Sequence, residues 1–469
     1  MDSQDSELDS ALTAVGPIDG RYRTRTRALV DYFSELALIR YRVRVEVEWL
    51  IALAGESAIK EFKLDAGAVR GLRALSRGLT LADARRVKEL ERRTNHDVKA
   101  IEYFLKERIA ADAIAVPPEM VHFACTSEDI NNLAYALILK EFCDRALAPA
   151  LEGIVATLGA MARRWRDVAL LARTHGQPAT PTTMGKELAV FASRLERQVR
   201  QLRRQEFLGK FNGAVGNLSA HHAACPEIDW IELSRRFVES IGLVWNPLTT
   251  QIESHDFLAE LFGVTVRIDT VLLGFARDMW GYIALGYFGQ RAAKDEIGSS
   301  VMPHKVNPID FENCEGNLGV ATALFEHLAT KLPVSRWQRD LSDSTAMRAI
   351  GSAFGHLMVA LDSLRRGLER VELNTGRIAA ALEAGEAWEV LAEAVQTAMR
   401  RHGLEKPYER LRELTRGRAV DRRAMREFIR SLELPVDARE RLERLAPRSY
   451  VGLAAELVQR FAPGGKSGT

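Results

Sequence analysis

A loop rich in reactive side chains lies at residues 296–310, where the sequence reads Glu-Ile-Gly-Ser-Ser-Val-Met-Pro-His-Lys-Val-Asn-Pro-Ile-Asp. Its glycine and two prolines disfavour a regular helix, so residues 298–307 are predicted to form a loop. The loop carries two hydroxyls, an imidazole and an ammonium group, on Ser299, Ser300, His304 and Lys305. A hydroxyl beside a cation suits the removal of a proton from a carbon atom next to a carboxylate. An ordinary Gly/Pro linker is the alternative interpretation.

The end of this loop predicts the start of a helix. Asn307 is expected to be the N-cap and Pro308 to occupy the first helical position. The free N–H groups and partial positive charge of a helix N-terminus favour an anion. The loop is therefore expected to bring its hydroxyls close to a bound anionic group.

A second loop with possible acid/base chemistry is predicted at residues 171–181, Leu-Ala-Arg-Thr-His-Gly-Gln-Pro-Ala-Thr-Pro. Its prolines disfavour helix, and helical periodicity resumes at Lys186. His175 is expected in the turn, where an imidazole can act as a general acid or base near neutral pH. A histidine that only satisfies loop carbonyls is the alternative.

The segment 123–132, Phe-Ala-Cys-Thr-Ser-Glu-Asp-Ile-Asn-Asn, predicts a helix start. Thr126 followed three residues later by Asp129 matches a capping box. The hydroxyls of Thr126 and Ser127 would then lie at the positive end of a helix, ready for a carboxylate or phosphate, unless the motif is a plain cap. Residues 133–139 are apolar on nearly every face, so this helix is expected to be surrounded by protein.

Three arginines lie among hydroxyls in residues 335–348: Arg336, Arg339 and Arg348. Guanidinium groups with Ser and Thr donors suit recognition of phosphate or carboxylate, although a solvated loop is the alternative. Weaker candidates are the turn-rich segment 16–22, the polar residues 94–98 within a predicted helical region 81–105, and Gln251 after a predicted turn.

Composition argues against several classes of protein. The 65 basic and 63 acidic residues nearly cancel, so no global field favours nucleic acid. The four cysteines lack CxxC spacing, and His221-His222 with Cys225 matches no standard zinc pattern, so neither a metal nor another cofactor is expected. No signal peptide is recognised, and Arg277 and Asp278 interrupt the apolar run 271–288, which favours a buried helix over a membrane span. A cytoplasmic protein is expected.

Helical periodicity recurs along the chain, at residues 32–54, 186–207, 254–288, 311–332 and 345–371. Few stretches alternate with period two, so the predicted fold class is all-α. Several helices are long and broadly apolar, which predicts a central bundle that buries further surface in an oligomer. Changes in composition suggest three domains: 1–115, 116–368 (the central long-helix bundle) and 369–469.

The pattern Gly-Ser-Ser-x-Met-Pro-x-Lys-x-Asn-Pro at residues 298–308 resembles the signature loop of the fumarase/aspartase superfamily, whose members eliminate fumarate from succinyl compounds. Thr-His-Gly-Gln-Pro at 174–178 resembles the second motif of that superfamily. With residues 94–98, 123–129 and 335–340, the likeness is closest to the long bacterial type of the adenylosuccinate lyase family, over about residues 14–461. This resemblance implies three helical domains, a homotetramer with active sites shared between subunits, and small nucleotide substrates.

The resemblance also implies residue roles. Ser299 matches the catalytic base and His175 the catalytic acid. The substrate-binding positions that match are Arg21, Tyr22, Asn95, His96, Asp97, Thr126, Ser127, Gln251, Ser300, Lys305, Asn307 and Asn313, with Arg339, Ser344, Thr345 and Arg348 on the nucleotide side. The implied reaction is release of fumarate from adenylosuccinate, giving AMP, and from succinyl-aminoimidazole-carboxamide ribotide.

Three alternatives stay open at this point. One is a sister lyase that acts on another succinyl or malyl compound. Another is a catalytically silent structural homologue, against which the presence of Ser299, Lys305 and His175 argues. The last is a helical nucleic-acid-binding protein, which the near-neutral net charge disfavours.

Overall fold

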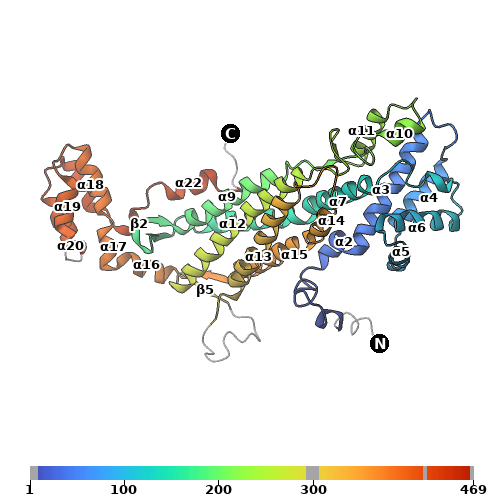
Figure 1. Cartoon of the computed structure of the whole chain (residues 1–469). Coiled ribbons are helices and arrows are strands. Elements are labelled where there is room, and N and C mark those ends of the chain that lie inside the picture. The colour runs from blue at the N-terminus through green and yellow to red at the C-terminus, as the bar shows by residue number, and fades with distance from the viewer. Residues whose placement is uncertain (1–8, 292–305, 416–419, 465–469) are drawn as a thin grey trace. The chain divides into compact units, whose positions relative to one another are not determined.

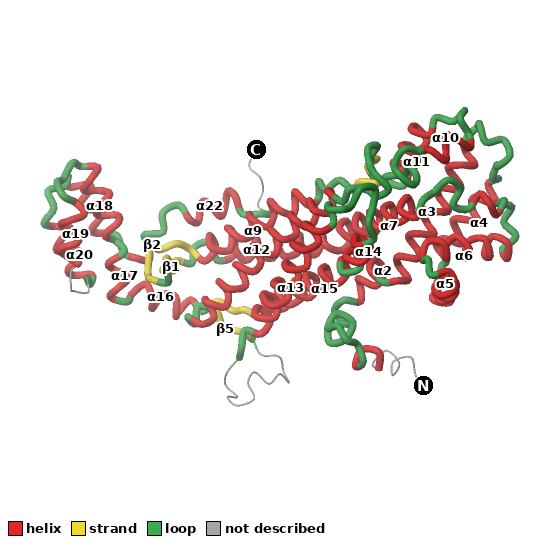
Figure 2. Tube along the Cα trace, viewed as in Figure 1, coloured by secondary structure: helices red, strands yellow, loops and turns green. Residues whose placement is uncertain are grey.

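Helices dominate the computed structural model, which describes residues 9–291, 306–415 and 420–464 (Figure 2). The strands of the described residues form three two-stranded sheets. The all-α fold class is therefore confirmed. The candidate residues Ser299, Ser300, His304 and Lys305 lie outside the described residues.

The chain divides into two compact units, and five helices have residues in both. Unit 1 contains Met1–Ala150, Gln198–Thr270 and Gly316–Asp362, and unit 2 contains Leu151–Arg197, Val271–Glu315 and Ser363–Thr469. The helices with residues in both units are α8 (Ala148–Arg164), α9 (Met184–Leu202), α12 (Asp256–Ala284), α13 (Ile309–Lys331) and α15 (Ile350–Arg370).

Besides its parts of these five helices, unit 1 contains a series of further elements (Figure 1). They are η1 (Arg27–Leu29), α2 (Val30–Phe33), α3 (Glu35–Gly55), α4 (Ala66–Arg77), α5 (Leu81–Thr94), α6 (Asp97–Ala111), η2 (Pro118–Met120), α7 (Ser127–Phe142), η3 (Cys143–Leu147), β3 (Leu208–Gly209), α10 (Ser219–Ala224), α11 (Trp230–Ser240), β4 (Val244–Trp245) and α14 (Ser342–Met347).

An aromatic cluster forms part of the core of unit 1. Phe354 of α15 packs edge-on against Phe142 of α7 and Phe325 of α13, with ring centroids 4.9 and 4.8 Å apart. Phe33 of α2 and Phe262 of α12 complete the cluster. Such edge-to-face pairs add to the free energy gained by burying the rings, so the cluster fixes how these helices cross.

Helix α7 continues through η3 into α8, so one helical segment runs from Ser127 to Arg164. Its middle, η3, is π-helical, and Pro149 follows two residues later. Proline lacks an N–H and its ring clashes with the carbonyl four residues before it, and a wider turn relieves this clash. The π-helical turn therefore allows the helix to continue past the proline.

Among the described residues, this segment is the one helix long and apolar enough to span a membrane by length and composition, and 44% of its most apolar window is buried. The core helix of a folded protein meets the same criterion, and residues Leu133, Leu137 and Leu139 are buried as predicted. Its first turn also carries two buried carboxylates, Glu128 and Asp129, in ion pairs. These features describe a core helix.

Unit 2 contains a β-hairpin followed by α9, and its C-terminal part is a series of short helices (Figure 1). The elements are β1 (Ala169–Thr174), β2 (Gln177–Thr183), β5 (Phe288–Gln290), β6 (Val371–Leu373), α16 (Thr375–Glu383), α17 (Gly385–Glu389), α18 (Ala392–Arg401), α19 (Pro407–Thr415), α20 (Arg422–Arg430), α21 (Val436–Arg444), η4 (Pro447–Ser449) and α22 (Ala454–Phe461). Helices α18 to α21 enclose a core of their own, which includes Val395, Met399, Met425 and Ile429.

Candidate active site

A buried ion pair stabilises the first turn of α7. Thr126 precedes the helix, and its N–H donates to Asp129 Oδ2 at 2.9 Å, which is one half of the predicted capping box. Asp129 also accepts N–H groups of Asn212 and Gly213, and its Oδ1 lies 2.9 Å from Lys210 Nζ. Both members of this Lys–Asp pair are fully buried. The hydroxyl-bearing Thr126 and Ser127 are thereby fixed at the helix N-terminus, partly exposed.

Three predicted binding segments meet in unit 1 through a chain of polar side chains. Glu128 Oε1 lies 2.9 Å from Arg339 Nη2 and accepts Asn131 Nδ2–H at 2.8 Å. Asn131 Oδ1 accepts Arg42 Nε–H at 2.8 Å, and Arg42 Nη2 pairs with Asp97 at 2.6 Å. Segments 95–97, 126–128 and 339–345 are thus held together by Glu128, Asn131 and Arg42.

The segment 95–97 corrects one prediction. The helical region expected at 81–105 is broken between α5 and α6, because Asn95 takes a left-handed conformation with φ of 50°. His96 then caps α6, and its Nδ1 accepts the Lys99 N–H at 3.2 Å. Burial alone would raise the pKa of Asp97, but the Arg42 guanidinium and the Val98 N–H outweigh it and lower the pKa. The polar residues 94–98, which were expected within one helix, therefore lie at the junction of two helices.

The predicted arginine segment forms a loop followed by α14, and a break at Arg348–Ala349 separates α14 from α15, where one helix had been expected over 345–371. Trp337 in the loop is 98% exposed and has φ of 47°. Ser344 and Thr345 lie on α14, and Arg348, at its end, is exposed and lies 3.5 Å from Glu35. Asp343 is buried beside Arg339, at 3.7 Å, and beside His255, also at 3.7 Å.

The N-terminal candidates lie in a turn, as predicted. Arg21 is exposed, whereas the Tyr22 ring lies under the Arg25 guanidinium, which forms a 2.7 Å ion pair with Asp362. A cavity of about 940 Å³ is lined by residues from 18 to 34 and by Arg348, Gly351 and Ser352. Arg21 and Tyr22 are not among its lining residues, but their neighbours Asp19 and Arg23 are.

Gln251 lies in the segment between β4 and α12, and its amide donates to the Ala214 carbonyl at 2.9 Å. The helix predicted to start near this residue begins later, at Asp256. His255, with φ of 63°, takes the last position before it.

His175 lies at the tip of a β-hairpin in unit 2. The prediction of a loop at 171–181 was wrong, although His175 is in the turn as expected: Thr174 and Gln177 pair across a two-residue connection. The φ values of His175 (54°) and Gly176 (76°) are both positive, as a type I′ hairpin turn requires. A side chain larger than glycine is strained there, and such strain clusters at functional sites. The exposed imidazole is therefore presented at the tip of the hairpin.

The remaining described candidates lie at the start of α13. Helix α13 begins at Ile309, one residue later than predicted, and the Pro308 carbonyl accepts the Phe311 N–H. Asn313 is half-buried, and its Oδ1 accepts the Ser363 hydroxyl at 2.6 Å. The other loop candidates, Ser299, Ser300 and Lys305, fall outside the described residues.

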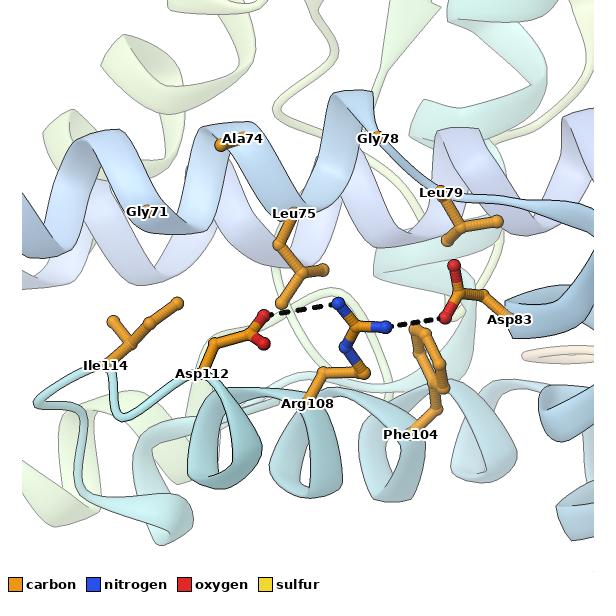
Figure 3. A pocket seen from close by; sticks show the side chains of 10 residues that line it. All are labelled: Gly71, Ala74, Leu75, Gly78, Leu79, Asp83, Phe104, Arg108, Asp112 and Ile114. Carbon is orange, nitrogen blue, oxygen red and sulfur yellow. Dashed lines mark hydrogen bonds and ion pairs between the residues drawn. The ribbon is translucent and has the colours of Figure 1, made fainter.

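A second cavity, of about 340 Å³, lies among α4, α5 and α6 (Figure 3). At its centre Arg108 pairs with Asp83 and Asp112, at 2.8 and 3.3 Å. None of its lining residues is a predicted site residue. For this reason the cavity is not included in the candidate site.

Comparison with known proteins decides the family. The model of the Lyase family matches residues 20–322, and the model described as Adenylosuccinate lyase C-terminal matches residues 335–451. An adenylosuccinate lyase of Vibrio cholerae is 53% identical over 96% of this chain and 99% of its own length. The chain belongs to the adenylosuccinate lyase family. The adenylosuccinate lyase of Escherichia coli K12 is 52% identical over the same shares of the two chains.

Solved structures share the fold of this family member. A fumarate lyase from Mesorhizobium sp. BNC1 aligns with a TM-score of 0.75 and 19% identity over 94% of this chain and 98% of its own. A 3-carboxy-cis,cis-muconate lactonizing enzyme from Pseudomonas putida aligns with a TM-score of 0.74 and 23% identity over 93% and 97%. At these identities the likeness concerns the fold alone.

Several residues that organise the site were not singled out from the sequence. These residues contact the candidate residues or their neighbours but do not belong to a recognised motif; they are Glu128, Lys210, Arg42 and His255. A signal existed only for Glu128, which lies between the predicted Ser127 and the capping Asp129. The partners of the others come from distant segments, so no local pattern could have indicated them.

Proposed function

We infer that this protein is an adenylosuccinate-cleaving carbon–nitrogen lyase of purine nucleotide biosynthesis. It eliminates fumarate from adenylosuccinate to give AMP, and from succinyl-aminoimidazole-carboxamide ribotide to give the free carboxamide ribotide. The observation that carries this conclusion is the 53% identity to a named adenylosuccinate lyase over nearly the full length of both chains.

The chemistry requires one base and one acid. A proton leaves the succinyl carbon next to a carboxylate, the carbon–nitrogen bond breaks, and the departing purine nitrogen takes up a proton. We assign the base role to Ser299 and the acid role to His175, because these positions match the motifs of the superfamily. Each acid/base step typically contributes about 10²–10⁴-fold to the rate. The hairpin supports the His175 assignment, since it presents an exposed imidazole on a defined turn.

The carbanion formed by proton removal needs stabilisation. We propose that Lys305 and nearby donors stabilise the charge delocalised into the carboxylate. A serine is a weak base at its ordinary pKa, so Ser299 is expected to act only when the loop excludes water and brings Lys305 close. Ser300, Asn307 and Asn313 are proposed to bind the substrate from the same part of the sequence.

The nucleotide side of the substrate is assigned to candidates in unit 1. We propose that Arg339, Ser344, Thr345 and Arg348 bind it. Other substrate-binding positions in this unit are proposed to be Arg21, Tyr22, Asn95, His96, Asp97, Thr126, Ser127 and Gln251. Support comes from the polar chain that links segments 95–97, 126–128 and 339–345. Further support is the cavity of about 940 Å³ beside Arg348.

A cytoplasmic homotetramer with shared active sites is proposed for the assembly. Large apolar side chains are exposed on the long helices α12 and α13, where Trp280, Ile309 and Val320 are 49%, 49% and 45% exposed. Such side chains suit burial against further copies of the chain. The three-domain division 1–115, 116–368 and 369–469 also stays a proposal, supported for the last domain by the separate core of α18 to α21.

The deciding experiment is an absorbance assay of fumarate release from the purified protein. Adenylosuccinate, the succinylated ribotide and non-purine succinyl or malyl compounds are offered side by side. Turnover of the first two compounds alone is expected. A preference for a non-purine compound would favour a sister lyase, and the absence of turnover with every compound would contradict the enzymatic assignment.

A further inference from the structure

Arg339 is held in place by two buried carboxylates in unit 1. Its Nη2 lies 2.9 Å from Glu128 Oε1 and 3.7 Å from Asp343 Oδ1, and the side chains of these two acids are 5% and 3% exposed. The closest approach of each carboxylate is to this same nitrogen, Nη2. Within the described part of the chain, the buried Nε–H of Arg339 has no hydrogen-bond acceptor.

Glu128 is itself held by the surrounding structure. It lies in the first turn of α7, whose start is fixed by the buried Lys210–Asp129 pair. Its Oε1 also accepts the Asn131 amide, which is held in turn by Arg42 and, beyond it, Asp97. The carboxylate that faces Arg339 therefore belongs to a rigid helix start and not to a flexible surface side chain.

An arginine side chain loses conformational entropy when it binds an anion in one fixed geometry. A carboxylate that already fixes one arm of the guanidinium removes part of this cost before the ligand arrives. Glu128, whose Oε1 lies 2.9 Å from Nη2, can fix one arm of the guanidinium in this way.

We propose that Glu128 is a positioning residue, which orients Arg339 toward the anionic nucleotide group of the substrate. This inference rests on the proposed function, in which Arg339 binds the nucleotide side. Glu128 does not touch the substrate itself, so its removal should weaken nucleotide binding more than it slows the chemical step.

The test is Glu128→Gln, which keeps the shape of the side chain and its acceptor oxygen but removes its charge. We expect KM for adenylosuccinate and the inhibition constant of AMP to rise together by roughly tenfold, because a misplaced guanidinium binds an anion poorly. The value of kcat should stay within about threefold of wild type, and inhibition by fumarate, which lacks the nucleotide, should not change.

The matched control is Glu141→Gln on the same helix. Glu141 pairs with Arg44 at 2.6 Å and with Arg145 at 3.1 Å, and its side chain is 18% exposed, but neither arginine is a predicted binding residue. This variant is expected to keep the wild-type KM and AMP inhibition. Equal effects of the two glutamine variants would overturn the proposal, since a general loss of helix charge would then explain both.

A double-mutant cycle with Arg339→Gln tests whether Glu128 acts through Arg339. If it does, adding Glu128→Gln to Arg339→Gln should raise KM no further. Additive effects, or a normal KM in folded Glu128→Gln, would overturn the positioning role. If Arg339→Gln itself left KM unchanged, the binding role of Arg339 and with it the positioning role of Glu128 would be refuted. If the wild type did not cleave adenylosuccinate, the proposed function would fail instead.

A second variant covers the case in which Glu128→Gln does not fold. Asn131→Ala keeps the charged side chains of Glu128 and Arg339 but removes the amide that donates a hydrogen bond to Glu128. A smaller increase in KM and in the AMP inhibition constant, again without change for fumarate, is expected. Wild-type values for both quantities would count against the proposal.

Discussion

Replacing Lys210 by methionine should destabilise unit 1 by about 3 kcal/mol, because the change leaves a buried carboxylate without its cation. Lys210 and Asp129 are both fully buried, and their charged atoms lie 2.9 Å apart. Breaking such a pair typically costs about 3–5 kcal/mol. Asp129 keeps N–H donors from Thr126, Asn212 and Gly213, which stabilise part of its charge. We therefore expect a value near the lower end of that range.

The chain offers a control that differs mainly in burial. Lys140 and Asp144 form another Lys–Asp pair, at 3.0 Å, but their side chains are 37% and 48% exposed. An exposed pair of this kind contributes about 0.5 kcal/mol or less. Lys140→Met should therefore unfold almost as the wild type does.

Thermal unfolding followed by circular dichroism gives the first measurement. A loss of about 3 kcal/mol corresponds to a decrease in Tm of roughly 5–10 °C for a unit of this size, against about 1–2 °C for the control. Hydrogen exchange of peptides covering residues 126–133 and 208–213 gives the second, and faster exchange is expected there in Lys210→Met alone. Equal Tm values for the two methionine variants would refute the reasoning.

The double variant Lys210→Met with Asp129→Asn separates loss of a contact from the cost of an unpaired charge. Asparagine removes the buried charge but keeps an acceptor for the neighbouring N–H groups. The loss in free energy of unfolding should therefore be smaller in the double variant than the sum of the losses in the two single variants. Strict additivity would show that the two side chains do not interact energetically.

Three further outcomes are expected. Ser299→Ala and His175→Ala should each remove nearly all turnover while adenylosuccinate still binds in equilibrium dialysis, and a variant keeping more than about a tenth of the wild-type rate would contradict its assigned role. Burial alone would lower the pKa of His122, but a buried carboxylate partner 2.6 Å away raises it overall. The stabilisation of the folded state by this pair is therefore present below about pH 6.5 and is lost as the pH rises through the raised pKa. The Tm values of the wild type and of His122→Gln should accordingly converge between pH 6 and pH 9. Glu393 accepts hydrogen bonds from Thr180 on the hairpin and from Tyr450. Glu393→Gln should therefore loosen the hairpin and lower kcat by about two- to fivefold with little change in KM. A change in KM alone would show that the hairpin does not position His175.

Local patterns predicted the helical elements well, because the spacing of apolar residues depends only on the geometry of a helix. The capping pair of Thr126 and Asp129 was recognised for the same reason, since both partners lie within one turn. Where prediction failed, the deciding feature was a backbone conformation that the side chains permit but that their pattern in the sequence does not predict. Asn95 ends a helix in the left-handed region inside a periodic stretch, and the segment around His175 pairs as a hairpin despite two prolines in β2.

The sequence by itself therefore determined the all-α class, the positions of most long helices, the family and the segments that hold the candidate site. Only the tertiary structure decided which side chains hold that site in place. Glu128 with Arg339, and Asp129 with Lys210, lie far apart in the chain and meet because the loops that carry Arg339 and Lys210 fold against the first turn of α7. A helical period says which face of a helix is buried, but not which residue of a distant segment will lie against it.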